Sequence, residues 1–387
     1  MPPLDREFDL VLFGATGFTG ALTAEYLAAR APADTRWALA GRDQAKLESL
    51  RDRLGVEVPV LPADARDPVA LRRIAEAARV VATTVGPYIR HGDPLVAACA
   101  EAGTDYVDLT GEPEFVDRTY LRHHATAERT GARLVHACGF DSVPHDLGAL
   151  FTVGHLPGDQ PIRMRGYVSA RGVLSGGTLD SAVTAFSRSR VTAATHAERR
   201  RAEPRDQARR VRIARGRPGY DRVAGAWVVP FPSIDPQVVA RSAQALDRYG
   251  PDFSYSHFLA VRSPLTAAGV VAGVGGVFAL AHFPPARRWL LRRRPAGTGP
   301  TAEQRAEGWF RVRFVARSGD RRVVTEVAGG DPGYGETSTM LAESALCLAH
   351  DALPDTAGQV TTAVAMGDRL RARLEKAGIT FRLVTGG

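Results

Sequence analysis

The chain has 387 residues, of which 44% are hydrophobic and 24% are charged. This composition is typical of a globular protein and excludes a mainly disordered or fibrous chain, and the length suggests two or three domains. The formal net charge is +8, from 50 basic and 42 acidic residues. The cysteines lie far apart and form no C-x-x-C pair, so the sequence indicates neither a disulfide framework nor a zinc site made of cysteines. We therefore expect a cytoplasmic protein.

Short apolar segments alternate with helical patterns through the first 150 residues. We predict strands at residues 8–13, 36–40, 56–61, 79–85, 106–109 and 133–137. We predict helices between them at residues 18–30, 44–54, 69–78, 94–102 and 114–130. Such alternation is typical of a parallel sheet covered by helices on both faces. The fold class predicted for residues 1–150 is α/β, a Rossmann-type doubly wound parallel sheet.

The pattern changes beyond residue 150. Residues 162–170 alternate as a half-buried strand, and residues 178–195 and 334–351 have helical patterns. Residues 309–317 and 322–327 alternate with period two around a Ser-Gly-Asp turn, which indicates an antiparallel pair. We predict a second, smaller α+β domain over residues 151–355, suited to substrate binding or dimerisation. The tail, residues 356–387, is predicted to form a helix that packs back on the body.

Three glycines, Gly14, Gly17 and Gly20, follow the first predicted strand at intervals of three residues. A glycine-rich turn between a strand and a helix is the fingerprint of a dinucleotide-binding domain. The helix N-terminus would present free N–H groups and a partial positive charge to the phosphates. The expected cofactor contacts are Gly14, Ala15, Thr16, Gly17, Phe18, Thr19 and Gly20.

The second predicted strand ends at Gly41 and Arg42. A cofactor without a 2′-phosphate usually meets an acid at this strand end, so a guanidinium there favours NADPH. The alternative is a solvated Arg42 beside a helix-capping Asp43. Asp64, after the third strand, is placed to meet the adenine end of the cofactor, and a turn-forming role is the alternative.

The fourth predicted strand ends in the sequence TTVGPY. The carboxyl ends of parallel strands form the ligand crevice of such a sheet. We therefore expect the nicotinamide ribose to lie against Thr84, Val85, Gly86 and Pro87. The alternative is a simple turn that ends the strand.

Four side chains near the strand ends are candidates for proton transfer: Tyr88, Asp141, Ser142 and His145. The alternative for Asp141 and Ser142 is capping of the helix that begins near residue 144. No metal is expected, because His123, His124 and Glu128 on one predicted helix lack a further ligand.

Positive charge is concentrated in residues 188–222, which include 12 arginines and only 4 acidic residues. Aromatic residues are sparse there, so no stacking platform for nucleic acid is predicted. We expect a solvated arm or a contact for an acidic partner. A second group of arginines, between residues 287 and 294, follows the uncharged segment 263–286.

Several motifs together resemble the saccharopine dehydrogenase-like oxidoreductases, and within them the trans-acting enoyl reductase branch. They are GATGFTG, AGRD, TTVGPY, YVDLTGE, HACGFDSVPHDLGA and GGDPGYGETSTMLAESALCLA. The resemblance implies an NADP-binding Rossmann domain, a smaller α+β domain and reduction of a C=C bond on a long acyl or polyketide chain. It also implies that residues 139–141 lie at the substrate site. A saccharopine-type C–N oxidoreductase and a non-catalytic lipid-surface or scaffold protein are the alternatives.

The uncharged segment 263–286 has three interpretations. Its inner part, residues 265–283, covers 19 residues, close to the roughly 20 of a bilayer span, but its glycines weaken it as an isolated helix. It could instead line a tunnel for a lipid chain or enter a membrane surface, or it could pack in the core. The expected ligand is a lipid-like or polyketide substrate. Three further interactions are open alternatives: a carrier protein that holds the substrate, peripheral contact with a membrane, and a homodimer.

Overall fold

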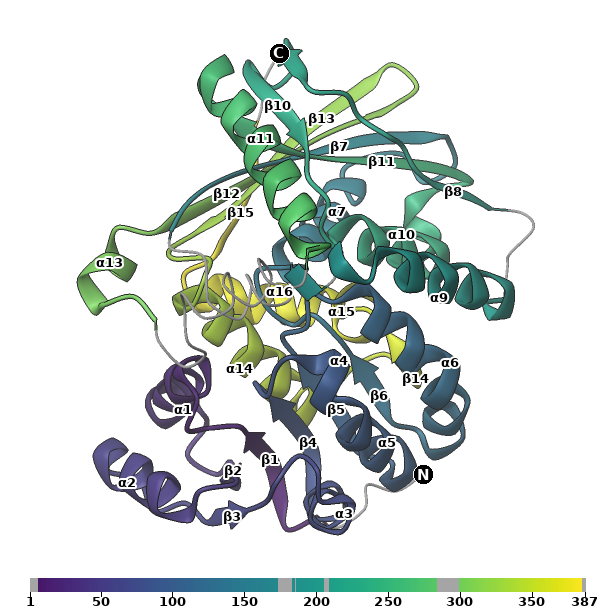
Figure 1. Ribbon diagram of the computed structural model, residues 1–387. Helices are drawn as coiled ribbons and strands as arrows, with labels where there is room; N and C mark the ends of the chain where they lie inside the picture. The colour runs from purple at the N-terminus through teal and green to yellow at the C-terminus, as the bar shows by residue number, and fades with distance from the viewer. Residues whose placement is uncertain (1–5, 173–182, 185, 205–208, 284–298, 385–387) are drawn as a thin grey trace.

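The computed structural model describes residues 6–172, 183–184, 186–204, 209–283 and 299–384. Two sheets form its two ends, and a layer of helices lies between them (Figure 1). The expected helix at residues 178–195 lies partly outside the described residues, and so does the arginine group at 287–294. The arrangement confirms the predicted fold class, a parallel Rossmann-type sheet with a second α+β part.

The first sheet is entirely parallel. Its strands are β1 (Phe8–Phe13), β2 (Trp37–Gly41), β3 (Val60–Pro62), β4 (Ala78–Thr83), β5 (Asp105–Asp108), β6 (Arg133–Val135) and β14 (Gly358–Val360). Their order across the sheet is β14–β6–β5–β4–β1–β2–β3. Every residue of β1 is buried because helices cover both faces, which explains the apolar run at residues 10–13. Asp9, the one charged residue of β1, is paired with Arg36.

Helices α3, α5 and α6 pack against one another along one face of this sheet, and α1 lies on the other face against α14. The bounds of the first six helices are α1 (Phe18–Arg30), α2 (Gln44–Leu54), α3 (Pro68–Ala77), α4 (Tyr88–His91), α5 (Asp93–Ala102) and α6 (Pro113–Thr130). Local sequence sets their ends: the Asp43 side chain accepts a hydrogen bond from the Lys46 N–H at the start of α2, and Gly55, with φ of +65°, ends it.

The second sheet is mixed. Its strands are β7 (Ile162–Arg171), β8 (Arg210–Ile213), β9 (Gly219–Asp221), β10 (Ala226–Pro230), β11 (Asp252–Val261), β12 (Trp309–Ser318), β13 (Arg321–Gly329) and β15 (Thr380–Leu383). Seven of them follow the order β15–β13–β12–β7–β11–β10–β9, and β8 pairs with β11. The predicted antiparallel pair is β12 and β13, in which Phe310, Val312 and Phe314 are buried between more exposed arginines.

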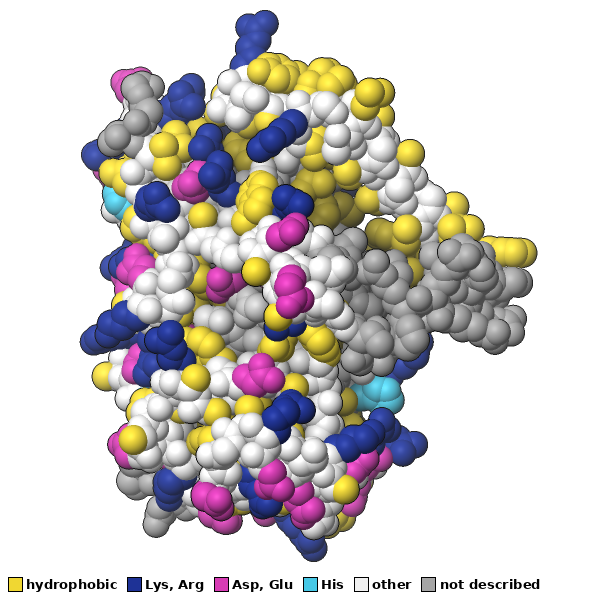
Figure 2. Space-filling view, turned by 90° about the vertical axis from the view of Figure 1, so that its left-hand side faces the viewer, with side chains coloured by type: hydrophobic (Ala, Val, Ile, Leu, Met, Phe, Trp, Pro, Cys, Tyr) yellow, Lys and Arg dark blue, Asp and Glu magenta, His cyan; other side chains and the backbone are white. Residues whose placement is uncertain are grey.

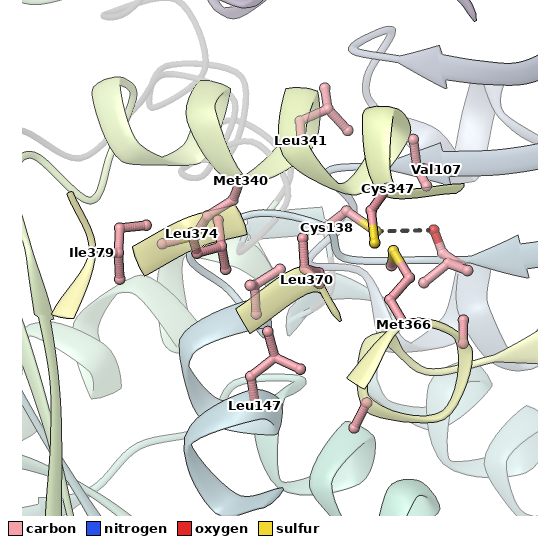
Figure 3. Close-up of a cluster of buried hydrophobic side chains, with 14 of the residues drawn as sticks. Val107, Cys138, Leu147, Met340, Leu341, Cys347, Met366, Leu370, Leu374 and Ile379 are labelled. Carbon is pink, nitrogen blue, oxygen red and sulfur yellow. Dashed lines mark hydrogen bonds between the residues drawn. The ribbon is translucent and has the colours of Figure 1, made fainter. Parts of the chain in front are cut away.

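The central layer joins the two sheets. It contains α7 (Val143–Val153), α14 (Gly335–His350), α15 (Thr362–Ala365) and α16 (Gly367–Lys376). Helix α7 packs on β12 and β13, whereas α14 packs on β4 and β5. Their apolar side chains belong to one cluster that extends from the first sheet to the second (Figure 3).

The chain passes between the sheets more often than a linear division at residues 150 and 355 implies. It enters the second sheet at β7, returns to the first for α14 and β14, and ends in the second sheet with β15. The tail forms α15 and α16 together with one strand in each sheet. Short strands such as β14 carry too little periodicity to be recognised without their pairing partners.

The remaining elements flank this body. They are α9 (Ser189–Ala202), α10 (Asp235–Ala245), the 3-10 helix η1 (Asp247–Tyr249), α11 (Pro264–Ala281) and α13 (Ala302–Ala306). Of the helices within the described ranges, α11 is long and apolar enough to cross a bilayer by length and composition alone. Its buried residues are Ala267 and Ala281, so it does not pack as a core helix.

The expected solvated arm between Arg188 and Arg222 is partly buried. Arg199 on α9 is 2% exposed, because its guanidinium contacts the carboxylates of Asp117 and Glu203. The same guanidinium lies 4.1 Å from the ring centroid of Tyr120. Buried charges need such partners, so the acids of α6 determine which arginines face solvent.

Leu370 on α16 is fully buried in the cluster that joins the two sheets (Figure 3). We expect Leu370→Ala to lower the free energy of unfolding by about 2–5 kcal/mol, since the substitution leaves a cavity. Leu265→Ala is the matched control, because Leu265 is 83% exposed, and it should change stability by less than about 0.5 kcal/mol. Urea unfolding measures both variants. Equal losses would contradict this account of the core.

Candidate active site

The loop between β1 and α1 lies tightly against the end of β4. Gly14 has φ of +90°, and a Cβ there would lie 2.7 Å from Val85 Cγ2 and 2.9 Å from Thr84 Oγ1. The Thr84 hydroxyl donates a hydrogen bond to the Gly14 carbonyl over 3.0 Å. A Cβ on Gly20 would lie 2.2 Å from the same carbonyl. Both positions therefore require glycine, and the loop is fixed before any ligand binds.

The N-terminus of α1 is open to a ligand. Its N-cap is Gly17, which has no side chain to accept a hydrogen bond, and its first turn contains no acid. Thr16 and Gly17 are exposed, whereas Ala15 is buried. An uncapped helix N-terminus of this kind offers N–H groups and a partial positive charge to an anion.

Phe18 and Thr19, the next residues along the chain, contact the C-terminal half of the protein. The Phe18 ring lies 4.8 Å from the Tyr334 ring and 5.7 Å from the Arg305 guanidinium. The Thr19 carbonyl accepts a hydrogen bond from the Ser338 hydroxyl. Within the expected cofactor loop, these two residues therefore also position α14.

A cavity of about 520 Å³ opens beside this loop, and Thr16, Arg42, Asp43, Gln44 and Lys46 line it. Arg42 is exposed and forms no ion pair within the described part of the chain. The cavity also contains Lys46 of α2, whose Nζ lies 3.6 Å from the Asp43 carboxylate. The 2′-substituent of an adenosine ribose would lie here, at the end of β2. Sequence reasoning missed Lys46, although its position four residues after Arg42, in the first turn of α2, was a usable signal.

Asp64 is engaged within its own turn. Its carboxylate accepts hydrogen bonds from the Arg66 backbone and guanidinium, and these bonds lower the pKa of Asp64 to about 2. This contact fits the turn-forming alternative, and the contact of Asp64 with the adenine end of the cofactor stays a prediction.

The segment after β4 turns through a cis peptide bond between Gly86 and Pro87. The Tyr88 hydroxyl donates to the Thr83 carbonyl over 3.1 Å and accepts from the Leu109 N–H over 3.2 Å. Burial raises the pKa of Tyr88 well above its usual value. Its single proton is already donated to the backbone, so the structure places Tyr88 as a brace between β4 and β5 rather than as a proton donor.

The buried carboxylate of Asp108 fixes the segment that carries the other candidates. It lies 2.7 Å from His136 Nδ1 and accepts hydrogen bonds from the Tyr106 hydroxyl and from the N–H groups of Thr110 and Ala137. These contacts join the ends of β5 and β6. The chain that follows, residues 139–142, is thereby directed along the carboxyl edge of the sheet.

Asp141 lies on this edge, half-buried, and its carboxylate makes no hydrogen bond to another described residue. The backbone approaches it closely, since a Cβ on Gly111 would lie 3.0 Å from Asp141 Oδ2. Burial, together with the nearby charge of Asp235, raises the pKa of Asp141 to about 7. A carboxylic acid that is protonated near neutral pH is suited to donate a proton.

Ser142 and His145 lie beside two residues that sequence reasoning missed, Asp235 and His257. The Ser142 hydroxyl is 3.5 Å from Asp235 Oδ1, and His145 Nδ1 is 3.7 Å from the same oxygen. His257 Nε2 is 3.2 Å from Asp235 Oδ2. Ser142 occupies the N-cap position of α7 without a capping hydrogen bond from its side chain. No local spacing links residues 145, 235 and 257, so only the fold brings them together.

Comparisons with known proteins agree on the family. Residues 10–135 match the family model of the saccharopine dehydrogenase NADP-binding domain. A candidate trans-acting enoyl reductase of Mycobacterium tuberculosis is 42% identical, over 99% of both chains. A trans-acting enoyl reductase of Mycobacterium bovis is 39% identical, over 98% of this chain and 99% of the relative.

A solved structure extends the likeness to the fold. The apo saccharopine dehydrogenase (L-Glu forming) of Saccharomyces cerevisiae has a TM-score of 0.57 and 13% identity, over 97% of this chain and 99% of that chain. The glycine loop, the open N-terminus of α1 and the cationic cavity fit NADP(H), the cofactor of the matched domain. Gly14 and Gly17 would hold its pyrophosphate, Gly20 would let α1 pack closely on the loop, and Arg42 and Lys46 would hold its 2′-phosphate.

Arg42 tests this assignment. We expect Arg42→Ala to weaken NADPH binding by about 10- to 100-fold, because a charge-assisted contact to the 2′-phosphate is lost. NADH has no such group, so its binding should change by less than about twofold. Arg66→Ala is the control, since that guanidinium is already paired with Asp64. Fluorescence titration with both cofactors measures the effect, and equal losses for NADPH and NADH would refute the assignment.

Proposed function

The chain belongs to the saccharopine dehydrogenase-like family, in its trans-acting enoyl reductase branch, and from this premise we propose that it reduces the C=C bond of an enoyl group on a long acyl or polyketide chain. The observation that carries this proposal is Asp141, a half-buried acid at the carboxyl edge of an NADP-binding sheet. Reduction of an enoyl group needs a hydride on one carbon and a proton on the other. NADPH supplies the hydride when bound.

Asp141 is the proposed proton donor. Its carboxylic acid would protonate the carbon next to the carbonyl and become a carboxylate, so that the substrate gains one hydride and one proton in total. Ser142 and His145 are proposed to position this acid and the substrate carbonyl. Desolvation raises the pKa of Asp141 to about 7, so that a substantial fraction of the side chain carries the proton that a general acid needs.

The surroundings of Asp141 suit an apolar chain. The Phe140 ring lies 5.0 Å from the Phe310 ring and 5.4 Å from the His145 ring, and Phe231 lies 6.0 Å from His257. Aromatic side chains of this kind accommodate an acyl chain through its apolar area. This supports a lipid-like or polyketide substrate over the small amino-acid imine of a C–N oxidoreductase.

The second sheet carries a group of arginines that would suit an acidic carrier protein as a partner. A cavity of about 490 Å³ is bordered by Arg165, Arg215, Arg217 and Arg222. In the described ranges, Arg215, Arg217 and Arg222 form no ion pair, whereas Arg165 is paired with Asp221 over 3.0 Å. Unpaired cations of one sign steer an anionic partner toward a surface. We propose that this surface contacts the carrier of the acyl chain.

The apolar helix α11 is proposed to bring the protein to a membrane surface, so that a cytoplasmic protein acts at the bilayer. Leu265 is 83% exposed, and Val271, Phe278 and Phe283 are 46%, 44% and 61% exposed. Figure 2 shows hydrophobic side chains along the protruding right-hand edge, in the region where α11 lies in Figure 1. An apolar surface of this extent gains free energy by entering lipid.

The proton-donor role predicts the behaviour of Asp141→Asn. We expect turnover of an enoyl thioester to fall by about 10²- to 10⁴-fold, because the amide has no acidic proton to donate, while NADPH binding changes little. Consumption of NADPH and a product heavier by two hydrogens measure the reaction. Asp247→Asn is the control, since that side chain is fully exposed. Unchanged turnover in Asp141→Asn would remove the residue as the acid.

The membrane contact predicts vesicle binding. In flotation with vesicles that contain anionic lipid, we expect the double variant Leu265→Asp with Phe278→Asp to lower the bound fraction at least tenfold, because two apolar side chains no longer enter the lipid. Val69→Asp on α3 is the matched control, because Val69 is 59% exposed but lies far along the chain from α11. Equal flotation of both variants would contradict a contact through α11.

A further inference from the structure

Three buried side chains from three separate elements converge between the sheets. His145 lies on α7, Asp235 begins α10, and His257 lies on β11. Each side chain is 1–2% exposed. One ligand atom from each, an imidazole nitrogen or a carboxylate oxygen, lies within 4.8 Å of the other two.

His145 lacks the hydrogen bonds that a buried imidazole requires. Neither ring nitrogen has a hydrogen-bond partner of normal geometry within the described part of the chain, although the Phe140 backbone lies near enough to influence the ring. A buried polar group without a partner destabilises the fold by about 1–3 kcal/mol, so such groups usually indicate a bound species. The Nδ1 atom lies 3.7 Å from Asp235, too far for a hydrogen bond.

The spacing of the three donors suits a tetrahedral metal ion. Zinc binds imidazole nitrogen and carboxylate oxygen at about 2.0–2.1 Å, which places neighbouring ligand atoms about 3.3 Å apart. Here His257 Nε2 lies 3.2 Å from Asp235 Oδ2, and His145 Nδ1 lies 3.7 Å from the other oxygen, Asp235 Oδ1. Small side-chain shifts would therefore bring all three donors onto one ion.

Neighbouring groups orient the donors as they do in known metal sites. The Tyr255 hydroxyl lies 3.0 Å from His257 Nδ1, which leaves Nε2 directed toward Asp235. The Ser233 hydroxyl donates to Asp235 Oδ2 over 2.7 Å. Contacts from outside the ligand set commonly fix the ring orientation of a metal-binding histidine and the position of a metal-binding carboxylate.

From this geometry we infer that His145, Asp235 and His257 form a site for one divalent transition-metal ion of the zinc type. Two imidazoles and one carboxylate leave a fourth position open, as in catalytic zinc sites. In its chemical role the inference rests on the proposed function: an ion there would polarise the carbonyl conjugated to the C=C bond, in place of a direct contact between His145 and that carbonyl. Metal binding itself does not depend on that role.

Cobalt(II) is the probe, because its visible absorption reports coordination directly. Full-length protein freed of metal with a chelator should bind one Co²⁺, with the intense bands of a four-coordinate site, and should release it to Zn²⁺. His145→Gln, Asp235→Asn and His257→Gln should each weaken Co²⁺ binding at least ~100-fold, since a ligand is lost. His145→Cys should retain binding and add a sulfur-to-cobalt charge-transfer band in the near ultraviolet.

His155→Gln is the matched control. Its ring is partly buried and bonded to the Phe151 carbonyl, away from the trio, so Co²⁺ binding should be unchanged. NADPH binding by every variant shows that the fold is intact, because the cofactor loop lies on the first sheet. Wild-type protein that binds Co²⁺ no more tightly than the Asp235→Asn variant would overturn the inference. That result would leave an Asp235–His257 ion pair and would not affect the enoyl reductase assay.

Discussion

The candidate site depends on one buried carboxylate at the edge of the first sheet. Asp108 is fully buried, and its carboxylate accepts hydrogen bonds from the Tyr106 hydroxyl of β5 and from the N–H groups of Thr110, after β5, and Ala137, after β6. An unpaired carboxylate there would be very unfavourable, so the surrounding donors are held in place. The Gly139–Asp141 turn therefore leaves the sheet in a fixed direction. The acid at residue 141 and the start of α7 receive their positions from this network.

Local sequence was sufficient to predict the NADP-binding domain. The spacing of Gly14, Gly17 and Gly20 between a strand and a helix predicts a phosphate-binding loop, and the family comparison confirms NADP binding. Such motifs are readable because the backbone that forms them is contiguous. Arg42 was equally accessible, since the end of β2 always faces the adenosine ribose in this fold. The first six strands of this sheet along the chain, β1 to β6, were predicted for the same reason, as short apolar runs between helical patterns, whereas β14 was not predicted.

Long-range packing determined what the sequence could not predict. Asp235 and His257 are distant from His145 along the chain, and neither carries a motif. Tyr88 appeared catalytic because it follows a strand end, yet the Thr83 and Leu109 backbones bind its hydroxyl. The basic run at 188–222 was interpreted from composition, but Asp117 on another helix buries Arg199. Burial and pairing of charges are properties of the assembled fold, and composition alone does not encode them.

The path of the chain constrains how the molecule can move. Two-lobed enzymes open by a hinge when few segments connect the lobes, since only those segments must bend. Here the chain crosses between the sheets after β6, after β13 and again after β14, and one apolar cluster fills the layer between them. Opening would require every crossing to bend together and would expose that cluster to water. We therefore expect the two sheets to unfold and refold as one cooperative unit rather than to open and close as separate lobes.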